Sequence, residues 1–176
     1  MSNHKLSVIL PNYNKPADRF TSYGTESHSI VEQIEICGKQ GIAKGVETLM
    51  LDGPTFINNQ NGKEVKAALE HHGLTLCSLI PYTFGGEFIK GSLGSCDSKI
   101  RRKTIDLVKK CIDLAAEMDC PYVGQWPGQD GWDYYFEEDY RKLYDWWVEG
   151  LQELADYNPD IKLGITKFNY CKTCNC

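Results

Sequence analysis

Residues 46–80 read VETLMLDGPTFINNQNGKEVKAALEHHGLTLCSLI and contain the pattern that decides the fold. Two short apolar runs, residues 46–51 and 74–80, flank a segment in which residues 65–69 carry a short helical pattern that ends before Gly73. Apolar runs that do not alternate with polar residues are typical of strands covered on both faces. A strand, a helix and a second strand in this order predict a β-α-β unit with two parallel strands.

The same alternation continues before this unit. Residues 6–10 (LSVIL) predict a buried strand that ends at Pro11-Asn12. A helix is expected from Ser29, because Ser29 and Glu32 have the spacing of a capping box, and Gly41 closes it.

The alternation also continues after the unit. Apolar residues at helical spacing predict one helix around residues 105–115 and a longer one over residues 140–155. Residues 122–125 and 161–165 predict a fourth and a fifth strand. The resulting order, β-α-β-α-β-α-β-α-β, leaves two architectures open: a doubly wound sheet of the flavodoxin kind, or the first portion of a (β/α)8 barrel.

Size, charge and cysteine usage narrow the functional classes. The chain has 176 residues, whereas a complete (β/α)8 barrel needs about 250. A net charge of -5 argues against nucleic-acid and membrane-surface binding, which require clustered Lys and Arg. No signal-like leader or membrane-length apolar run is present, so we expect a cytoplasmic protein without disulfides, in which cysteines of the apolar segments are small core residues.

Both architectures place function in the loops after the strands, and these loops contain several candidate residues. Asp52 follows the second strand, where it can act as a base or hold a sugar hydroxyl, or can simply form the Asp-Gly-Pro turn. His28 ends the loop after the first strand and is either a substrate contact or an ordinary residue before a helix cap. Phe88 belongs to the long aromatic loop after the third strand, which we expect to be an ordered wall.

The loop after the fourth strand is the most informative. Trp126 directly follows a buried strand and is close in sequence to Gln129 and Asp130. An exposed indole beside polar side chains forms a platform for carbohydrates, with an apolar face for C–H groups and polar edges for hydroxyls. The alternative is a Trp126 ring that packs under its own loop.

Residues 126–131 (WPGQDG) resemble the Trp-x-Gly-Arg-Glu-Gly motif that follows strand four in xylose isomerases and related sugar isomerases and epimerases. Residues 88–93 (FIKGSL), Asp97, Arg101 and residues 112–117 (IDLAAE) resemble the same family, in the same order. The resemblance implies a (β/α)8 barrel with a small-molecule sugar substrate. It also implies a divalent metal (Mn, Mg, Co or Zn) that polarises the substrate oxygens while protein groups move a proton or hydride.

The sequence departs from the family pattern in two places. Gln129 and Asp130 stand where the motif has Arg and Glu, which leaves the substrate open. Thr166 stands where the family places the first metal carboxylate, within a Glu-x-Lys-x-x-Glu-Pro-type motif, and none of the family's metal ligands can be carried over. Cys171, Cys174 and Cys176 then end the chain, either as an accidental tail or as a soft-metal site with too few ligands.

We therefore expect residues 1–165 to form a partial xylose isomerase-like barrel, with about five parallel strands and four helices, and residues 166–176 to be an aberrant Cys-rich tail. The intact parent would be a metal-dependent sugar isomerase or epimerase, and this chain alone would bind no metal and be inactive. Its half-barrel edges would favour self-association. The alternatives are a non-catalytic open α/β module for a small ligand or partner, and an endonuclease IV-like barrel, which the acidic charge disfavours.

Overall fold

The structure, a computed structural model, describes residues 5–14, 27–127 and 138–165. These residues form five parallel strands and four α-helices in the predicted order, which confirms the expected element pattern. The strands are β1 (Ser7–Ile9), β2 (Gly45–Met50), β3 (Thr75–Pro81), β4 (Tyr122–Gln125) and β5 (Lys162–Ile165). The helices are α1 (Ile30–Gln40), α2 (Gly62–His72), α3 (Ser98–Glu117) and α4 (Tyr140–Tyr157), with short 3-10 helices η1 (Leu10–Tyr13) and η2 (Gly86–Phe88).

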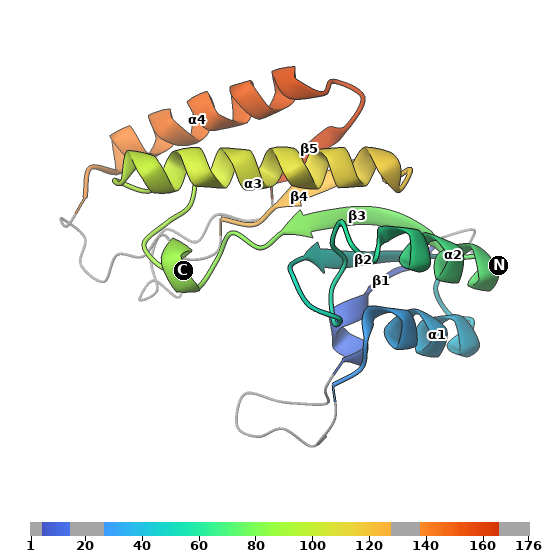
Figure 1. The fold of residues 1–176 in the computed structure, drawn as a ribbon. Coiled ribbons are helices and arrows are strands. Elements are labelled where there is room, and N and C mark those ends of the chain that lie inside the picture. Colours follow the sequence, from blue (N-terminus) through green and yellow to red (C-terminus); the bar gives the residue numbers. More distant parts are fainter. Residues whose placement is uncertain (1–4, 15–26, 128–137, 166–176) are drawn as a thin grey trace.

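The order of the strands decides between the two architectures. The sheet runs β1-β2-β3-β4-β5, so each strand pairs with its neighbour in sequence. A flavodoxin-like sheet would have reversed direction after its first crossover and given the order 2-1-3-4-5. Figure 1 shows the helices following the strands in chain order, from α1 at the bottom to α4 at the top. The sheet is therefore wound in one direction only, as in the first half of a (β/α)8 barrel.

The two faces of the sheet have different surroundings. In β2, Val46, Thr48 and Met50 are buried, whereas Glu47 and Leu49 between them are partly exposed. Because side chains alternate along a strand, the first set faces the helices and the second set faces the opposite side. The register aligns Glu47 with Ser78 of β3. Right-handed crossovers in one direction place all four helices on one face, so no helix of the described residues covers the other face.

Two predicted boundaries were wrong. The predicted strand over residues 6–10 is shorter, because Leu10 is buried in η1, where Pro11 in the first turn favours a helical backbone. The helix predicted around residues 65–69 begins earlier, at Gly62, and ends at His72, directly before Gly73 as predicted. The apolar signal underestimated its length because only one narrow face of α2, centred on Val65 and Leu69, is buried.

The loop before α3 anchors α4. Leu93 is 1% exposed, and a Cβ on Gly94 would lie 2.6 Å from Nε1 of Trp147. α4 is also tied to α3 by charge: Arg102 and Lys109 both contact the carboxylate of Glu153, at 2.8 and 2.7 Å. The close approach of Gly94 to Trp147 holds the long β3–α3 segment, which carries Phe88, against α4. None of the helices in the described ranges is long and apolar enough to cross a membrane.

Candidate functional site

Three aromatic rings form a row at the carboxyl ends of β3 and β4. The ring centroids of Tyr82 and Phe84 are 4.3 Å apart, and those of Phe84 and Trp126 are 4.6 Å apart in an edge-to-face arrangement. Trp126 remains 39% exposed. We call Tyr82, Phe84 and Trp126 the aromatic row. The Trp126 ring packs edge to face on Phe84 of the loop after β3, and part of the ring stays exposed.

A buried polar pair lies next to this row in the sequence. Nε2 of Gln125 donates a hydrogen bond of 2.8 Å to Oγ1 of Thr83, and both residues are 1% exposed. The bond joins the end of β4 to the segment after β3. It therefore fixes Trp126 and Phe84, the next residues along each chain segment, relative to each other. The sequence offered Gln125 as the end of a strand, but it gave no signal for its pairing with Thr83, which lies 42 positions away.

Asp52 lies at a neighbouring strand end, in the turn after β2. Its exposed carboxylate lines a cavity of about 300 Å³, which Lys110 of α3 also lines. The turn itself is held by Asn58, whose Nδ2 donates to the carbonyl of Gly53 at 3.0 Å. Gly53 has a φ of 111°, a conformation that favours glycine. The Asp-Gly-Pro segment is thus a built turn that also presents a carboxylate to a cavity.

His28 is placed by the start of α1. It directly precedes Ser29, which caps the helix and forms the predicted capping box with Glu32. The carbonyl oxygen of His28 accepts a 3.0 Å hydrogen bond from Nε2 of Gln33, and the same amide donates to the carbonyl of Thr55 at 2.9 Å. Gln33, which the sequence did not single out, therefore ties the segment after β1 to the segment after β2.

The other predicted site residues have separate locations. Phe88 is 6% exposed and lines a second cavity of about 520 Å³ beside α3. Gln129 and Asp130 lie outside the described residues, as does the tail with its three cysteines. Tyr82 is common to the two cavities and the aromatic row: it lines both cavities, and its ring is the first of the row.

The described ranges do not provide a metal site of the kind expected from the family. They contain no group of three or more His, Cys, Asp or Glu side chains arranged to hold a metal ion. In the cavity that Asp52 lines, the other polar lining residues include Asn58, Gln60 and Lys110, and none of them is a further carboxylate. These residues do not fit a divalent cation.

The sequence of the chain is similar to that of a known protein family. The sequence profile of the Xylose isomerase-like TIM barrel family matches residues 11–166, most of the chain. The chain belongs to this family. Within it, the chain is 27% identical over 137 residues to the xylose isomerase of Thermus thermophilus, which covers 77% of this chain and 35% of that enzyme.

Solved structures show the same half-barrel relationship. A D-psicose 3-epimerase crystallised in the presence of D-fructose has a TM-score of 0.67 at 18% identity and covers 97% of this chain and 55% of its own. A xylose isomerase-like TIM barrel protein from Mycobacterium smegmatis in complex with magnesium has a TM-score of 0.62 at 15% identity, covering 95% and 56%. The fold therefore corresponds to about half of these barrels, and the chain spans about a third of the xylose isomerase.

Proposed function

We propose that this chain is the substrate-facing amino-terminal half of a sugar isomerase or epimerase barrel. The observation that carries the proposal is the aromatic row at the carboxyl ends of β3 and β4, the edge at which (β/α)8 enzymes bind their substrates. Family membership supports the sugar class, since the xylose isomerase and the D-psicose 3-epimerase named above act on sugars.

The described residues would bind and orient a sugar rather than transform it. The exposed part of Trp126 offers an apolar face to the C–H groups of a sugar ring, held in place by Phe84 and by the Gln125–Thr83 bond. Asp52, in the turn after β2, can accept hydrogen bonds from the hydroxyls of the sugar. Gln129, Asp130, Phe88 and His28 are further proposed contacts. A divalent metal, where bound in the family, polarises the substrate oxygens; we propose that this chain alone binds none and has no isomerase activity.

The binding part of the proposal is tested with two tryptophan variants. Trp126 lies at the strand ends, whereas Trp146 lies on α4, with the guanidinium of Arg101 4.2 Å from the centre of its ring. Titration of the full chain with D-fructose should change the tryptophan fluorescence of the wild type and of Trp146→Phe. It should leave Trp126→Phe unchanged. An equal response from Trp126→Phe would contradict a sugar site at Trp126.

The absence of any sugar response would favour the alternative function. D-fructose, D-xylose and D-tagatose should then all leave both the fluorescence and the thermal unfolding of the wild type unchanged. A non-catalytic α/β module that binds another small ligand or a partner would become the better description, and the aromatic row would be a packing feature of the loops.

We also propose that residues 1–165 form the partial barrel unit, that residues 166–176 are an aberrant tail, and that this chain associates with itself when made alone. The sheet ends in β1 and β5, and each of these strands pairs on one side within the described residues. Ile9 of β1 and Ile165 of β5 are 45% and 51% exposed. Strand edges and exposed apolar side chains of this kind favour association.

A further inference from the structure

The two cavities beside α3 form one groove on the outer side of the strand ends. The cavity of about 520 Å³ and the cavity of about 300 Å³ share four lining residues, Leu51, Tyr82, Leu107 and Lys110. We call the two cavities together the outer groove. On the helix side, its wall is a single face of α3, because residues 103, 107 and 110 recur at helical spacing. The sequence did not point to this groove, because the lining of the groove comes from separate parts of the chain: the segment after β2, the segment after β3, and α3.

The aromatic row leads into the outer groove. Tyr82 lines both cavities, and its ring is also the first of the three rings in the row that ends at Trp126. A Cβ on Gly85 would lie 3.0 Å from the hydroxyl oxygen of Tyr82, so the glycine leaves room for the phenol end. Tyr82 therefore belongs both to the aromatic row and to the lining of the groove.

The charges of the groove favour a neutral ligand. Lys103 pairs with Glu87 at 2.7 Å, and Asp106 pairs with Arg102 at 3.0 Å. The remaining charged lining groups are one carboxylate and one ammonium, Asp52 and Lys110, which have opposite sign. A strongly charged ligand would be repelled by one of these two groups or would compete with the existing ion pairs.

The remaining lining has the composition of a carbohydrate site. Leu51, Leu107 and Tyr82 supply apolar surface, and Asn59 and Gln60 stand at the rim of the smaller cavity beside Asp52. An aromatic ring with a few carboxylate, ammonium and amide groups matches both surfaces of a sugar: its C–H face and its hydroxyls. Cavities of this size lie within the range of about 300–1,000 Å³ that small-molecule sites occupy.

We infer that the outer groove holds the second unit of a glycoside, so that the substrate class is a neutral glycoside or disaccharide rather than a free monosaccharide. This inference rests on the proposed function for the first unit, which would contact Trp126. The second unit, a sugar ring or an apolar aglycone, would lie between Tyr82 and α3, with its polar groups near Lys110.

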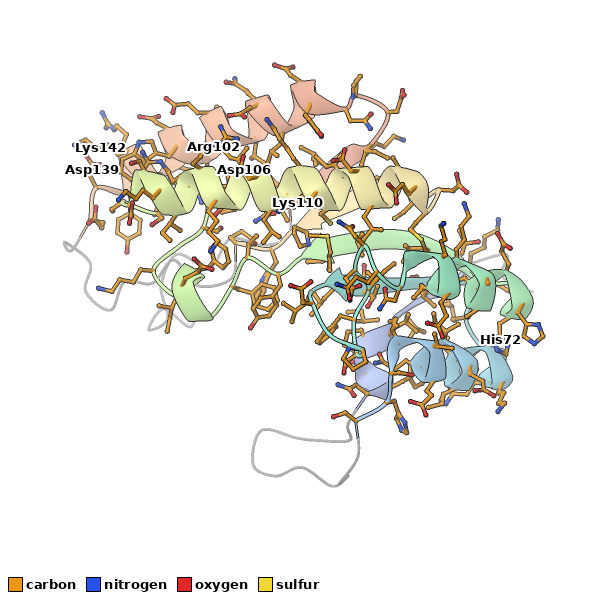
Figure 2. All side chains as sticks on the ribbon, viewed as in Figure 1. His72, Arg102, Asp106, Lys110, Asp139 and Lys142 are labelled. Atoms are coloured by element: carbon orange, nitrogen blue, oxygen red, sulfur yellow. The ribbon has the colours of Figure 1, made fainter. Side chains whose placement is uncertain are left out.

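The test compares two neutral probes, D-glucose and phenyl β-D-glucopyranoside, by titration calorimetry on the full chain. The groove variants are Leu107→Trp, which fills the shared floor, and Lys110→Ala, which removes a shared polar contact. The matched control is Lys142→Ala. Figure 2 places Lys142 at the start of α4 and Lys110 on α3. Thermal unfolding of each variant checks that it folds, and Lys110→Ala remains informative should Leu107→Trp fail to fold.

We expect the wild type and Lys142→Ala to bind the phenyl glucoside about tenfold more tightly than D-glucose, which corresponds to about 1.4 kcal/mol. Leu107→Trp should abolish this preference and Lys110→Ala should reduce it about threefold, while D-glucose affinity stays unchanged. The inference would be overturned if the wild type bound both probes equally well, or if both groove variants preferred the phenyl glucoside as strongly as the wild type does. Either result would leave the proposed function intact. If neither probe binds, the inference fails, and the titration with D-fructose decides whether the proposed function fails with it.

Discussion

Replacement of Gly94 by alanine tests how α4 is held against the half barrel. A Cβ at this position would lie 2.6 Å from Nε1 and 2.8 Å from Cδ1 of Trp147, and 2.7 Å from Cγ of Leu143. Normal contacts between such atoms are about 3.5–4.0 Å, so the loop and α4 would have to separate by about 1 Å. Neither side chain can swing away easily, because Trp147 is 4% and Leu143 is 2% exposed.

Overpacking of this kind costs about 1–3 kcal/mol. For a chain of this size each kcal/mol lowers the melting temperature by about 2–4 °C, so Gly94→Ala should melt about 2–12 °C below the wild type. The matched control is Gly164→Ala in β5, where a Cβ would meet nothing within 4 Å. That variant should melt at or slightly above the wild-type temperature, because alanine restricts the unfolded chain.

Thermal unfolding followed by far-ultraviolet circular dichroism measures both variants, and the near-ultraviolet signal reports on the packing of Trp147. A Gly94→Ala protein that melts within 1 °C of the wild type, with an unchanged near-ultraviolet spectrum, would refute the reasoning. It would mean that the segment carrying Gly94 yields without cost and does not anchor α4.

Three further outcomes are expected. Hydrogen bonds from Arg102, then Lys109, lower the pKa of Glu153 to about 2 from its ordinary 4.5; this group therefore stabilises the fold above about pH 4.5, and its contribution is lost as pH falls toward 2. Glu153→Gln should remove that pH dependence and lower the free energy of unfolding by about 1 kcal/mol or less at pH 7, because solvent screens the ion pairs. If the free energy of unfolding of the variant and of the wild type fell equally with pH, this reasoning would be contradicted. Gln33→Leu should destabilise by about 1–3 kcal/mol in chemical denaturation, since two loop carbonyls lose their donor, and a loss below about 0.5 kcal/mol would show that water replaces it. Sedimentation velocity of the chain made alone should show concentration-dependent association, whereas a single monomer at all concentrations would exclude it.

The elements that follow local rules could be predicted from the sequence. The spacing of Ser29 and Glu32 predicted the start of α1, and the structure contains their capping box. The apolar stripe of α4 predicted a long helix, and Leu143, Trp147 and Leu154 are its buried side. Such features depend on residues three or four positions apart, so the sequence contains all of the information needed.

The candidate site could be predicted only in part. Trp126 and Asp52 were identified because each directly follows an apolar strand, and the structure places Trp126 against Phe84 and Asp52 in a cavity. Thr83, Gln33 and Lys110 gave no such signal. Their roles arise from partners that are distant in the sequence, such as the cavity that joins Lys110 of α3 to the turn after β2.

The sequence by itself determined the alternation of strands and helices, the parallel sheet and, through residues 88–93 and 126–131, the resemblance to sugar isomerases. The tertiary structure decided the winding of the sheet in one direction and the formation of the aromatic row and the outer groove. The physical reason is that apolar periodicity reports only that a face is buried. Which segments cover that face, and which side chains meet at the strand ends, depend on the packing of the whole chain.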